Sequence, residues 1–577
     1  MNFRKLLRLG MQIALSALLP AIAHAENFQI RLGPQLEQPA YDGRLVLIFS
    51  KEEKPDLRSR DTVNAFYDSD QIYGVSVDGL SKSGKIVVDK QAIGFPQNSL
   101  SDLPAGRYFV QASLNVYTTY HRADGHVVKL PSAHGGGQIF AKEPGNLYSI
   151  PRWIDFDPKK PGTIGIVLDH ANPPIPDPAD TPFVKHIRIR STLLSKFWGT
   201  DIYLRAHVLV PKDFDQHPEA HFPLIVFHGH FPADFGGFRT TPPDPNAKCV
   251  PSWRFRTDCY NHTEDQESYN FYKYWTDKDT PRALIVEIDH SNQYYDDSYA
   301  VNSANLGPYG DAIMRELIPA IEQKYHGIGR GWARFLYGGS TGGWESLAVQ
   351  VKYPDEFNGA FVACPDPVDF RAMLNFNLYE EPNAYYRIGP FGTIVRPAYR
   401  DYLGQISRTI EGENRWELVL GDKDRSGGQY DIWNAVFSPV GPDGYPARIW
   451  DKRTGVIDKS IAGYWRDNYD LRHIMERDWA TLGPKLRGKI HIYVGEEDSF
   501  YLNDAVYLIE DFLKKANPPF EGEVDYGARA EHCWNGDHIN GNGIARLRYN
   551  SFYMPKIMTR IRMSAPAGAD VTSWRYP

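Results

Sequence analysis

Residues 333–342 read ARFLYGGSTG, and this short run is the most informative pattern in the chain. Its first half is apolar, as in a buried strand, and its second half is Gly-x-Ser-x-Gly centred on Ser340. A helical pattern follows, in which Leu347, Ala348 and Val351 share one face. A sharp turn from strand to helix needs small residues around the serine, so that its hydroxyl projects above the sheet. The context predicts a nucleophilic serine; the alternative is an ordinary serine in a glycine-rich turn.

The sequence around this motif alternates buried strands with amphipathic helices. Helices are expected over residues 308–325, with a kink at Pro319, and over residues 502–515. Such alternation is typical of a mostly parallel sheet with helices on its faces. The expected strands are 206–210, 224–227, 283–288, 333–337, 359–363 and 490–494.

The chain before this region has a different pattern. Residues 26–172 alternate short apolar runs with turn residues, which predicts a β-sandwich-like domain. Residues 173–182 hold five prolines in ten positions and are expected to form a semi-rigid linker. The α/β domain then covers residues 183–577. Within it, residues 365–489 interrupt the regular pattern and are predicted to form a lid or binding wall, with a structural elaboration as the alternative.

Two segments resemble functional motifs but are predicted to be hairpin turns. Residues 134–137 read HGGG, like the oxyanion loop of a lipase, yet they precede the linker. Residues 79–85 resemble a P-loop, but Ile86 replaces the required Ser or Thr and begins an apolar run typical of a strand.

The N-terminus and the composition limit where the protein acts. Residues 1–25 combine basic residues, a short apolar stretch and Ala-His-Ala, which predicts a signal peptide and a secreted or periplasmic protein; an uncleaved anchor is the alternative. The 577 residues include 64 basic and 71 acidic ones, so nothing favours nucleic acid. A mean hydropathy of -0.46 argues against stable membrane insertion.

Export would place the four cysteines in an oxidising compartment, where an even number allows three pairings. Cys249 and Cys259 are ten residues apart and are expected to form a local disulfide. Cys364 and Cys533 remain. Cys364 follows an expected strand and Cys533 follows a candidate catalytic histidine, so we expect both at the same sheet edge. A disulfide between them is predicted, and two buried thiols are the alternative.

A serine nucleophile needs a histidine base that is oriented by a carboxylate, in the chain order Ser, acid, His. Asp498 is the expected acid, because it follows a late strand. Glu496 and Glu497 are alternatives beside it, and Asp422 and Asp424 are weaker ones within the interruption.

Two histidines follow the final expected strand, residues 524–526. His532 comes first and is the expected base, while His538 is the alternative and is expected near the C-terminal helix.

Acyl transfer also needs two N–H donors for the oxyanion. Thr341 is expected to supply one, and His230, in the loop after an earlier strand, the other. A metal bound by His228 and His230 is disfavoured, since no third ligand is near in sequence, and the chain has no CxxC or HExxH motif. We therefore expect no metal and no cofactor.

Several motifs together resemble a known family. Residues from about 185 to 560 are similar to the esterase D-like α/β hydrolases, which include enterochelin esterases, feruloyl and acetylxylan esterases, and mycolyltransferases. The resemblance implies a Ser340–Asp498–His532 triad and ester chemistry without a cofactor. By analogy, tannases and some feruloyl esterases also carry a bonded cysteine just after the catalytic histidine. The motifs are VLVPKDF at 208–214, HG at 228–229, ELIP at 316–319, GGSTGG at 338–343, PDEF at 354–357 and GEED at 495–498.

These observations favour an exported serine esterase that forms an acyl-enzyme. Its expected partner is a small-molecule or carbohydrate-linked ester. The alternatives are an acyltransferase or peptidase that uses the same triad, and a non-catalytic binding protein on a hydrolase scaffold.

Overall fold

The computed structural model describes residues 26–36, 40–59, 63–66, 68–131, 140–230 and 235–576. The predicted signal peptide and the HGGG segment at 134–137 lie outside the described residues. Among the described residues, none of the helices has both the length and the apolar character that a membrane span requires.

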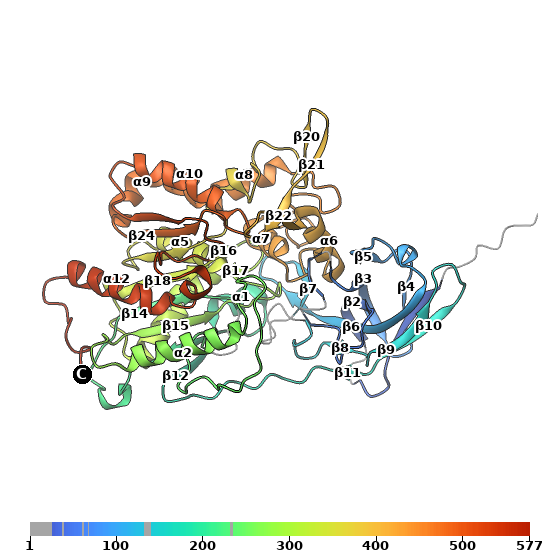
Figure 1. Cartoon of the computed structure of the whole chain (residues 1–577), viewed down its shortest axis with the longest axis horizontal. Coiled ribbons are helices and arrows are strands. Elements are labelled where there is room, and N and C mark those ends of the chain that lie inside the picture. Colours follow the sequence, from blue (N-terminus) through green and yellow to red (C-terminus); the bar gives the residue numbers. More distant parts are fainter. Residues whose placement is uncertain are drawn as a thin grey trace, which may run out of the picture.

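An eight-stranded sheet runs through the larger part of the molecule (Figure 1). Its first two strand pairings are antiparallel and the other neighbours pair in parallel. The inner parallel strands are buried almost throughout, in agreement with their continuous apolar runs, whereas the edge strand Glu523–Gly527 is mostly half-buried. In spatial order the strands are β12 (Val184–Ser191), β13 (Ile202–Leu209), β15 (Leu284–Asp289), β14 (Leu224–His228), β18 (Arg334–Gly339), β19 (Ala360–Ala363), β24 (Ile490–Gly495) and β25 (Glu523–Gly527).

The helices that cover this sheet fall into two groups. In one group, α5 (Thr341–Lys352) packs against α9 (Leu471–Leu486), and α9 packs against α10 (Leu502–Lys515). In the other, α2 (Tyr260–Thr276) contacts α12 (Tyr549–Ser564).

The helix expected over residues 308–325 is divided into three pieces. α3 (Tyr309–Ala312) leads into a π-helical turn, Ile313–Leu317, before α4 (Ile318–Tyr325). Pro319 lies in the first turn of α4, where its missing N–H is tolerated, and the wider turn precedes it.

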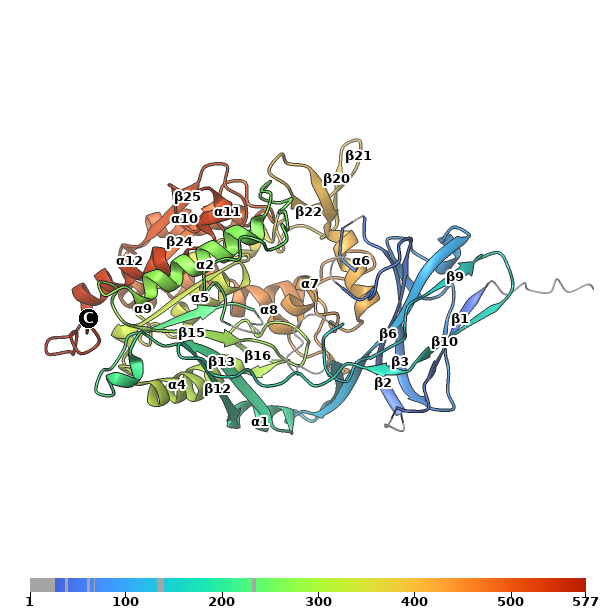
Figure 2. The ribbon, with the colours of Figure 1, turned by 60° about the horizontal axis from the view of Figure 1, so that its bottom comes forward.

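The N-terminal region is rich in strands and forms two sheets (Figure 2). Side chains of both sheets meet in one apolar core, which includes Phe28, Leu47 and Phe156. The larger sheet comprises β2 (Ala40–Ser50), β3 (Gln71–Ser81), β5 (Ile93–Phe95), β6 (Gly106–His121), β7 (Val127–Pro131), β8 (Leu147–Tyr148), β9 (Arg152–Phe156) and β11 (His170–Ala171). The smaller one comprises β1 (Asn27–Leu32), β4 (Ile86–Val88) and β10 (Thr163–Leu168).

One expected turn in this region has a different role. Residues 82–85 do form a turn after β3, and Gly84 N–H donates to the Ser81 carbonyl. The turn does not close a hairpin, however, because β4 pairs with β1 of the smaller sheet. Residues 172–183, which include the predicted linker, contain neither helix nor strand. The division of the chain into domains stays a prediction.

Residues 365–489 leave the main sheet and reach the N-terminal region. They form two hairpins and three helices before α9 returns to cover the sheet, and α6 packs on β2, β3 and β5. The hairpins and helices are β20 (Tyr386–Gly389) with β21 (Gly392–Val395), β22 (Pro397–Arg400) with β23 (Ile406–Thr409), α6 (Ile410–Leu420), α7 (Gln429–Phe437) and α8 (Lys459–Tyr469).

Arg44 of β2 fixes this contact. Its guanidinium is buried and donates from Nε to the Val419 carbonyl (2.9 Å) and from Nη2 to the Leu418 carbonyl (2.6 Å). Both carbonyls belong to the last turn of α6, where helix carbonyls have no partner within the helix. A cation at this end also complements the helix dipole. Arg44 therefore caps a helix that lies about 375 residues later in the chain.

Arg44→Met should destabilise the protein strongly. The substitution keeps an apolar stem but leaves two buried carbonyls without donors, so we expect the free energy of unfolding to fall by about 2–4 kcal/mol. Chemical denaturation measures the change. Arg190→Met is the control, because Arg190 pairs with Asp201 on the surface and such pairs contribute up to about 1 kcal/mol. Equal effects of the two substitutions would contradict the capping role.

Candidate active site

Ser340 stands at a tight crossing of backbones between β18 and α5. Its φ is 59° and its ψ is -125°, a combination that L-residues seldom adopt and that a nucleophile turn requires. The neighbouring glycines leave no room for side chains. A Cβ at Gly342 would lie 1.8 Å from the His228 carbonyl oxygen, and one at Gly338 would lie 2.3 Å from the Gly342 carbonyl oxygen. Both glycines are therefore required by close approach, and they bring the ends of β14 and β18 together.

His532 and Asp498 meet beside this turn. His532 Nδ1 lies 2.8 Å from Asp498 Oδ2, and both side chains are buried. Asp498 follows β24, and its other oxygen accepts a hydrogen bond from the Phe500 N–H at 2.9 Å. The Phe500 ring packs edge-on against the imidazole. The carboxylate is thus held so that it orients one nitrogen of His532.

The alternative residues have other surroundings. His538 is exposed, and its Nε2 contacts Asp525 Oδ2 at 2.8 Å. Asp422 accepts a hydrogen bond from Ser76 and pairs with Arg425, whereas Asp424 accepts one from Asn434. Glu496 is exposed and Glu497 lies 3.6 Å from Arg529 Nε.

The hydroxyl of Ser340 donates to Asp366 Oδ1 at 3.5 Å. Among the described residues there is no hydrogen bond between Ser340 and His532. Catalytic hydrogen bonds are often long without substrate and shorten in the Michaelis complex, so this geometry is compatible with a base at His532.

Cys533 affects the base directly. Burial lowers the pKa of His532, but a Cys533 thiolate and the Asp498 carboxylate outweigh burial and raise that pKa to about 10. The hydrogen bond from Cys364 is in turn the main cause that lowers the pKa of the Cys533 thiol well below its ordinary value. The histidine next to the nucleophile therefore holds its proton more tightly than an ordinary histidine.

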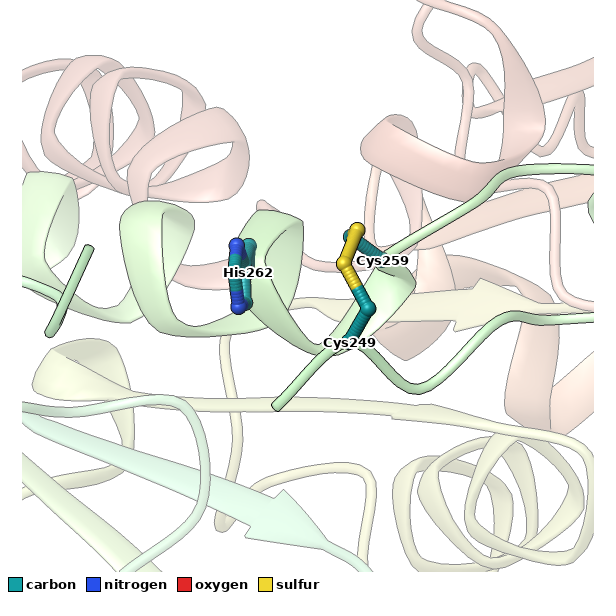
Figure 3. Close-up of side chains that lie close together, drawn as sticks. All are labelled: Cys249, Cys259 and His262. Atoms are coloured by element: carbon teal, nitrogen blue, oxygen red, sulfur yellow. A yellow bond between two sulfur atoms is a disulfide. The ribbon is translucent and has the colours of Figure 1, made fainter. Parts of the chain in front are cut away.

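The four cysteines behave as two different pairs. Cys249 and Cys259 form the expected disulfide, beside His262 on α2 (Figure 3). Cys364 and Cys533 are brought together as expected, but as free cysteines with their sulfur atoms 2.7 Å apart. The disulfide between Cys364 and Cys533 stays a prediction. Cys364 Sγ also accepts a hydrogen bond from the Ser340 N–H at 3.2 Å.

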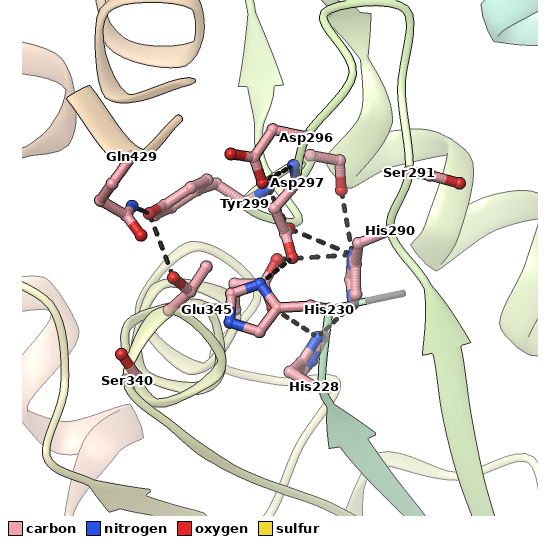
Figure 4. Close-up of polar contacts among 12 residues, drawn as sticks. His228, His230, His290, Ser291, Asp296, Asp297, Tyr299, Ser340, Glu345 and Gln429 are labelled. Carbon is pink, nitrogen blue, oxygen red and sulfur yellow. Dashed lines mark hydrogen bonds and ion pairs between the residues drawn. The ribbon is translucent and has the colours of Figure 1, made fainter. Parts of the chain in front are cut away.

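The predicted oxyanion donors lie on either side of the crossing. Thr341 is buried at the start of α5, directly after Ser340. His230 follows β14, and its side chain turns toward Asp297, with 3.2 Å between Nδ1 and Oδ2 (Figure 4).

A buried cluster of histidines and acids lies behind this loop (Figure 4). His228 Nδ1 is 3.1 Å from His290 Nε2. The Glu345 carboxyl lies close to both rings, with Oε2 3.7 Å from His228 Nδ1 and Oε1 3.4 Å from His290 Nδ1. Donor atoms of these three residues lie within 4.8 Å of one another, as a metal site would require. His230 does not belong to this group. Its members besides His228 are His290, directly after β15, and Glu345 on α5.

The charge of this cluster depends on the protonation of Glu345 and of the two histidines. Burial raises the pKa of Glu345 well above its ordinary value, and the nearby Asp297 charge raises it further. Burial lowers the pKa of His228 and of His290. Within the described residues neither Glu345 nor Asp297 pairs with Lys or Arg, so no cationic side chain neutralises their charge. A protonated Glu345 beside neutral histidine rings reduces that charge and adds a hydrogen-bond donor to the cluster.

A cavity of about 450 Å³ opens onto Ser340. Residues from three parts of the chain form its walls. The main sheet and its loops contribute Ser340, Phe500 and Leu502; the 365–489 segment contributes Asp366, Leu374, Arg408, Glu413, Trp416, Leu420, Ser426, Gly427, Gly428, Gln429, Tyr430 and Trp433; and the N-terminal region contributes Arg58, Val63, Asn64, Ala65, Phe66 and Phe140.

Sequence reasoning missed the last of these walls and Asp366. The N-terminal residues lie far from Ser340 in the chain, and no motif marks them. Asp366 follows β19. Residues directly after the carboxyl end of a parallel strand tend to line the ligand site, and this position was the available sequence signal for Asp366.

No family model matches the sequence, and no curated protein matches it. Similar solved structures include a ferulic acid esterase, which is 15% identical over 66% of this chain and 98% of its own, with a TM-score of 0.34. An S-formylglutathione hydrolase from Staphylococcus aureus is 11% identical over 66% of this chain and 99% of its own (TM-score 0.33). A ferulic acid esterase from Anaeromyces mucronatus is 12% identical over 65% and 91% (TM-score 0.27).

The structures named here are esterases and a hydrolase, and a putative dipeptidyl aminopeptidase IV from Bacteroides ovatus is also similar, at 13% identity over 92% of this chain and 68% of its own (TM-score 0.35). Identities this low and TM-scores below 0.5 say nothing about the substrate. What the chain does has to be inferred from its own residues.

The pKa of His532 predicts an alkaline activity profile. A general base works only when deprotonated, so kcat/KM should rise with pH through a midpoint above the ordinary value of 6.5. Cys533→Ser removes one negative charge and should move this midpoint to lower pH. The measurement is kcat/KM against pH under reducing conditions. A midpoint that does not move in the Cys533→Ser variant would contradict the coupling.

Proposed function

We propose that the protein is an exported serine esterase that uses Ser340, His532 and Asp498. The observation that carries this proposal is a serine on a strained strand-to-helix turn that faces a cavity, together with a buried histidine whose Nδ1 lies 2.8 Å from a carboxylate. Cys364 Sγ links the two, because it contacts the Ser340 N–H and lies within 4.8 Å of a ring nitrogen of His532. These are the parts that acyl transfer through a covalent intermediate requires.

The proposed reaction has two halves. His532 takes the Ser340 proton as the hydroxyl oxygen attacks the ester carbonyl, and Asp498 stabilises the imidazolium and fixes its tautomer. The backbone N–H groups of Thr341 and His230 stabilise the oxyanion. The imidazolium then protonates the leaving alcohol. In the second half, His532 deprotonates a water molecule, which attacks the acyl-enzyme and releases the acid and Ser340.

We propose a small-molecule or carbohydrate-linked ester as substrate. Aromatic side chains such as Trp416 and Trp433 line the cavity together with polar groups such as Arg408 and Gln429. A cavity of about 450 Å³ is within the range that binds small ligands.

Export and domain structure belong to the same proposal. The Cys249–Cys259 disulfide supports an oxidising compartment, because such bonds are rare in reducing ones. The two sheets of the N-terminal region support a β-sandwich-like domain over residues 26–172, and the parallel strand pairs support an α/β hydrolase domain over 183–577.

Ser340→Ala should abolish esterase activity and leave the fold unchanged. Loss of the nucleophile typically lowers kcat by about 10⁴- to 10⁶-fold. Hydrolysis of p-nitrophenyl esters measures the esterase activity, and labelling by a fluorophosphonate probe measures the reactivity of the nucleophile. Circular dichroism checks the fold. His532→Ala should reduce activity equally, whereas His538→Ala, the matched control, should retain it. Activity of Ser340→Ala within tenfold of the wild type would refute the assignment.

The N-terminal wall of the cavity should affect binding of large substrates. Phe66 lines the cavity, and the Arg408 guanidinium stacks 4.5 Å from its ring centre. Phe66→Ala should raise KM for aryl or sugar-linked esters by about fivefold to thirtyfold, which corresponds to the loss of about 1–2 kcal/mol of apolar contact. Ile388→Ala, an exposed position on β20, is the control. Equal KM values for large esters in the wild type and Phe66→Ala would exclude this wall from the binding site.

A further inference from the structure

Asp366 holds one of its oxygens in a fixed set of hydrogen bonds. Oδ2 accepts from the Tyr299 hydroxyl at 2.7 Å, from Thr341 Oγ1 at 3.1 Å and from Trp433 Nε1 at 3.2 Å. An indole N–H can only donate, so Trp433 requires an acceptor at this place. Gln429 donates to the Tyr299 oxygen, which leaves the Tyr299 proton free for Asp366. These contacts fix both the position and the acceptor role of Oδ2.

The other oxygen faces the nucleophile and the cavity. Oδ1 lies 3.5 Å from Ser340 Oγ, at the outer limit of a hydrogen bond, and Asp366 lines the same cavity as Ser340. The side chain is 4% exposed. Asp366 therefore presents one acceptor oxygen, beside the attacking atom, inside the substrate cavity.

This carboxylate is compensated by hydrogen bonds and by nearby histidines. Within the described part of the chain, no Lys or Arg forms an ion pair with Asp366. Burial raises its pKa, and the hydrogen bonds from Tyr299 and Trp433, together with the charges of the nearby His230 and His532, oppose that rise. A buried carboxylate is costly unless hydrogen bonds or a positive charge compensate it. A donor supplied by the substrate would complete the compensation.

The distance from Oδ1 to Ser340 defines where such a donor must be. In a reactive complex, the ester carbonyl carbon lies about 3–3.5 Å from the nucleophilic oxygen. A nitrogen or oxygen on the adjacent carbon lies about 2.5 Å from the carbonyl carbon. It can therefore reach an acceptor 3.5 Å from Ser340 Oγ with hydrogen-bond geometry.

The contacts of Asp366 place this donor on the acyl side of the ester. The leaving alcohol must lie next to His532, which receives the Ser340 proton and returns it. Asp366 instead contacts Thr341, Tyr299 and Trp433, the residues around the expected oxyanion donor.

Resting on the proposed esterase function, we propose that Asp366 selects esters whose acyl group carries a hydrogen-bond donor, a hydroxyl or an ammonium group, on the carbon next to the scissile carbonyl. Asp366 is then a specificity-determining residue. It recognises the acyl group while Ser340 and His532 perform the reaction.

Three methyl esters of equal shape test this inference. Methyl lactate carries a hydroxyl at the relevant position, methyl alaninate an ammonium group, and methyl isobutyrate a methyl group. We expect the wild-type kcat/KM to be at least about tenfold higher for a donor ester than for isobutyrate, since charge-assisted hydrogen bonds contribute about 1.5–3 kcal/mol. The released acid is titrated at pH 6.5, where the alaninate amine is charged. Enzyme is supplied at high concentration, because the raised pKa of His532 predicts low activity at this pH for all three esters.

Two variants assign the preference to Asp366. Asp366→Asn keeps the shape and removes the charge, so the alaninate-to-isobutyrate ratio should fall by about tenfold to a hundredfold. Asp366→Ala should reduce the lactate ratio as well. Asp470→Asn is the matched control: Asp470 is also buried and accepts a Tyr hydroxyl, from Tyr379 at 2.6 Å, but it does not line the cavity. Its ratios should equal those of the wild type.

The outcomes separate this inference from the esterase proposal. A preference for alaninate alone supports recognition of ammonium, and a preference for both donor esters supports recognition of either group. Hydrolysis that depends on Ser340 but shows no donor preference overturns the role of Asp366 and leaves the esterase standing. A preference that survives both Asp366 variants, or falls equally in Asp470→Asn, also overturns it. Hydrolysis that survives Ser340→Ala overturns the esterase itself.

Discussion

The backbone contacts at Gly338, Gly342 and Gly343 are the constraint on which the site depends. Each glycine touches a carbonyl of a neighbouring segment so closely that no Cβ fits: the contacts are with Gly342, with His228 of β14 and with Ala363 of β19. The start of α5 is thereby pressed against the ends of three parallel strands. His230, Ser340 and Asp366 follow those strands, so one packing requirement sets the spacing of the expected oxyanion loop, the nucleophile and the acyl-side carboxylate.

The electrostatics around this crossing are unusually acidic. Asp297, Glu345 and Asp366 are all buried near histidines and have no Lys or Arg partner in the described part of the molecule. An oxyanion would form in a negative field if every carboxyl were ionised. Burial keeps the pKa of Glu345 high, and a neutral Glu345 removes one of these charges. The protonation of the cluster therefore matters to the chemistry above it.

The local parts of the site could be predicted from sequence. Gly-x-Ser-x-Gly after an apolar strand marks the turn, and the order of Asp498 and His532 follows from parallel-sheet topology. The disulfide of Cys249 and Cys259 is close in sequence and was also predictable. Contacts between residues far apart in the chain could not be predicted from the sequence. Nothing near Asp366 in the sequence indicates that Trp433 donates to it, and nothing near His228 indicates that Glu345 faces it, because tertiary packing alone creates both arrangements.

The docking of α6 on the N-terminal sheet has a consequence during synthesis. Val46, Ile48 and Ile72 pack with Val419 and Leu420, so this sheet face is completed by residues that are made about 375 positions later. At translation rates of about 5–20 residues per second, the interval is roughly 20 to 75 s. Throughout it, the emerging chain displays apolar strands whose natural cover does not yet exist. The N-terminal sheet therefore completes its apolar packing only after residues 410–420 have been made.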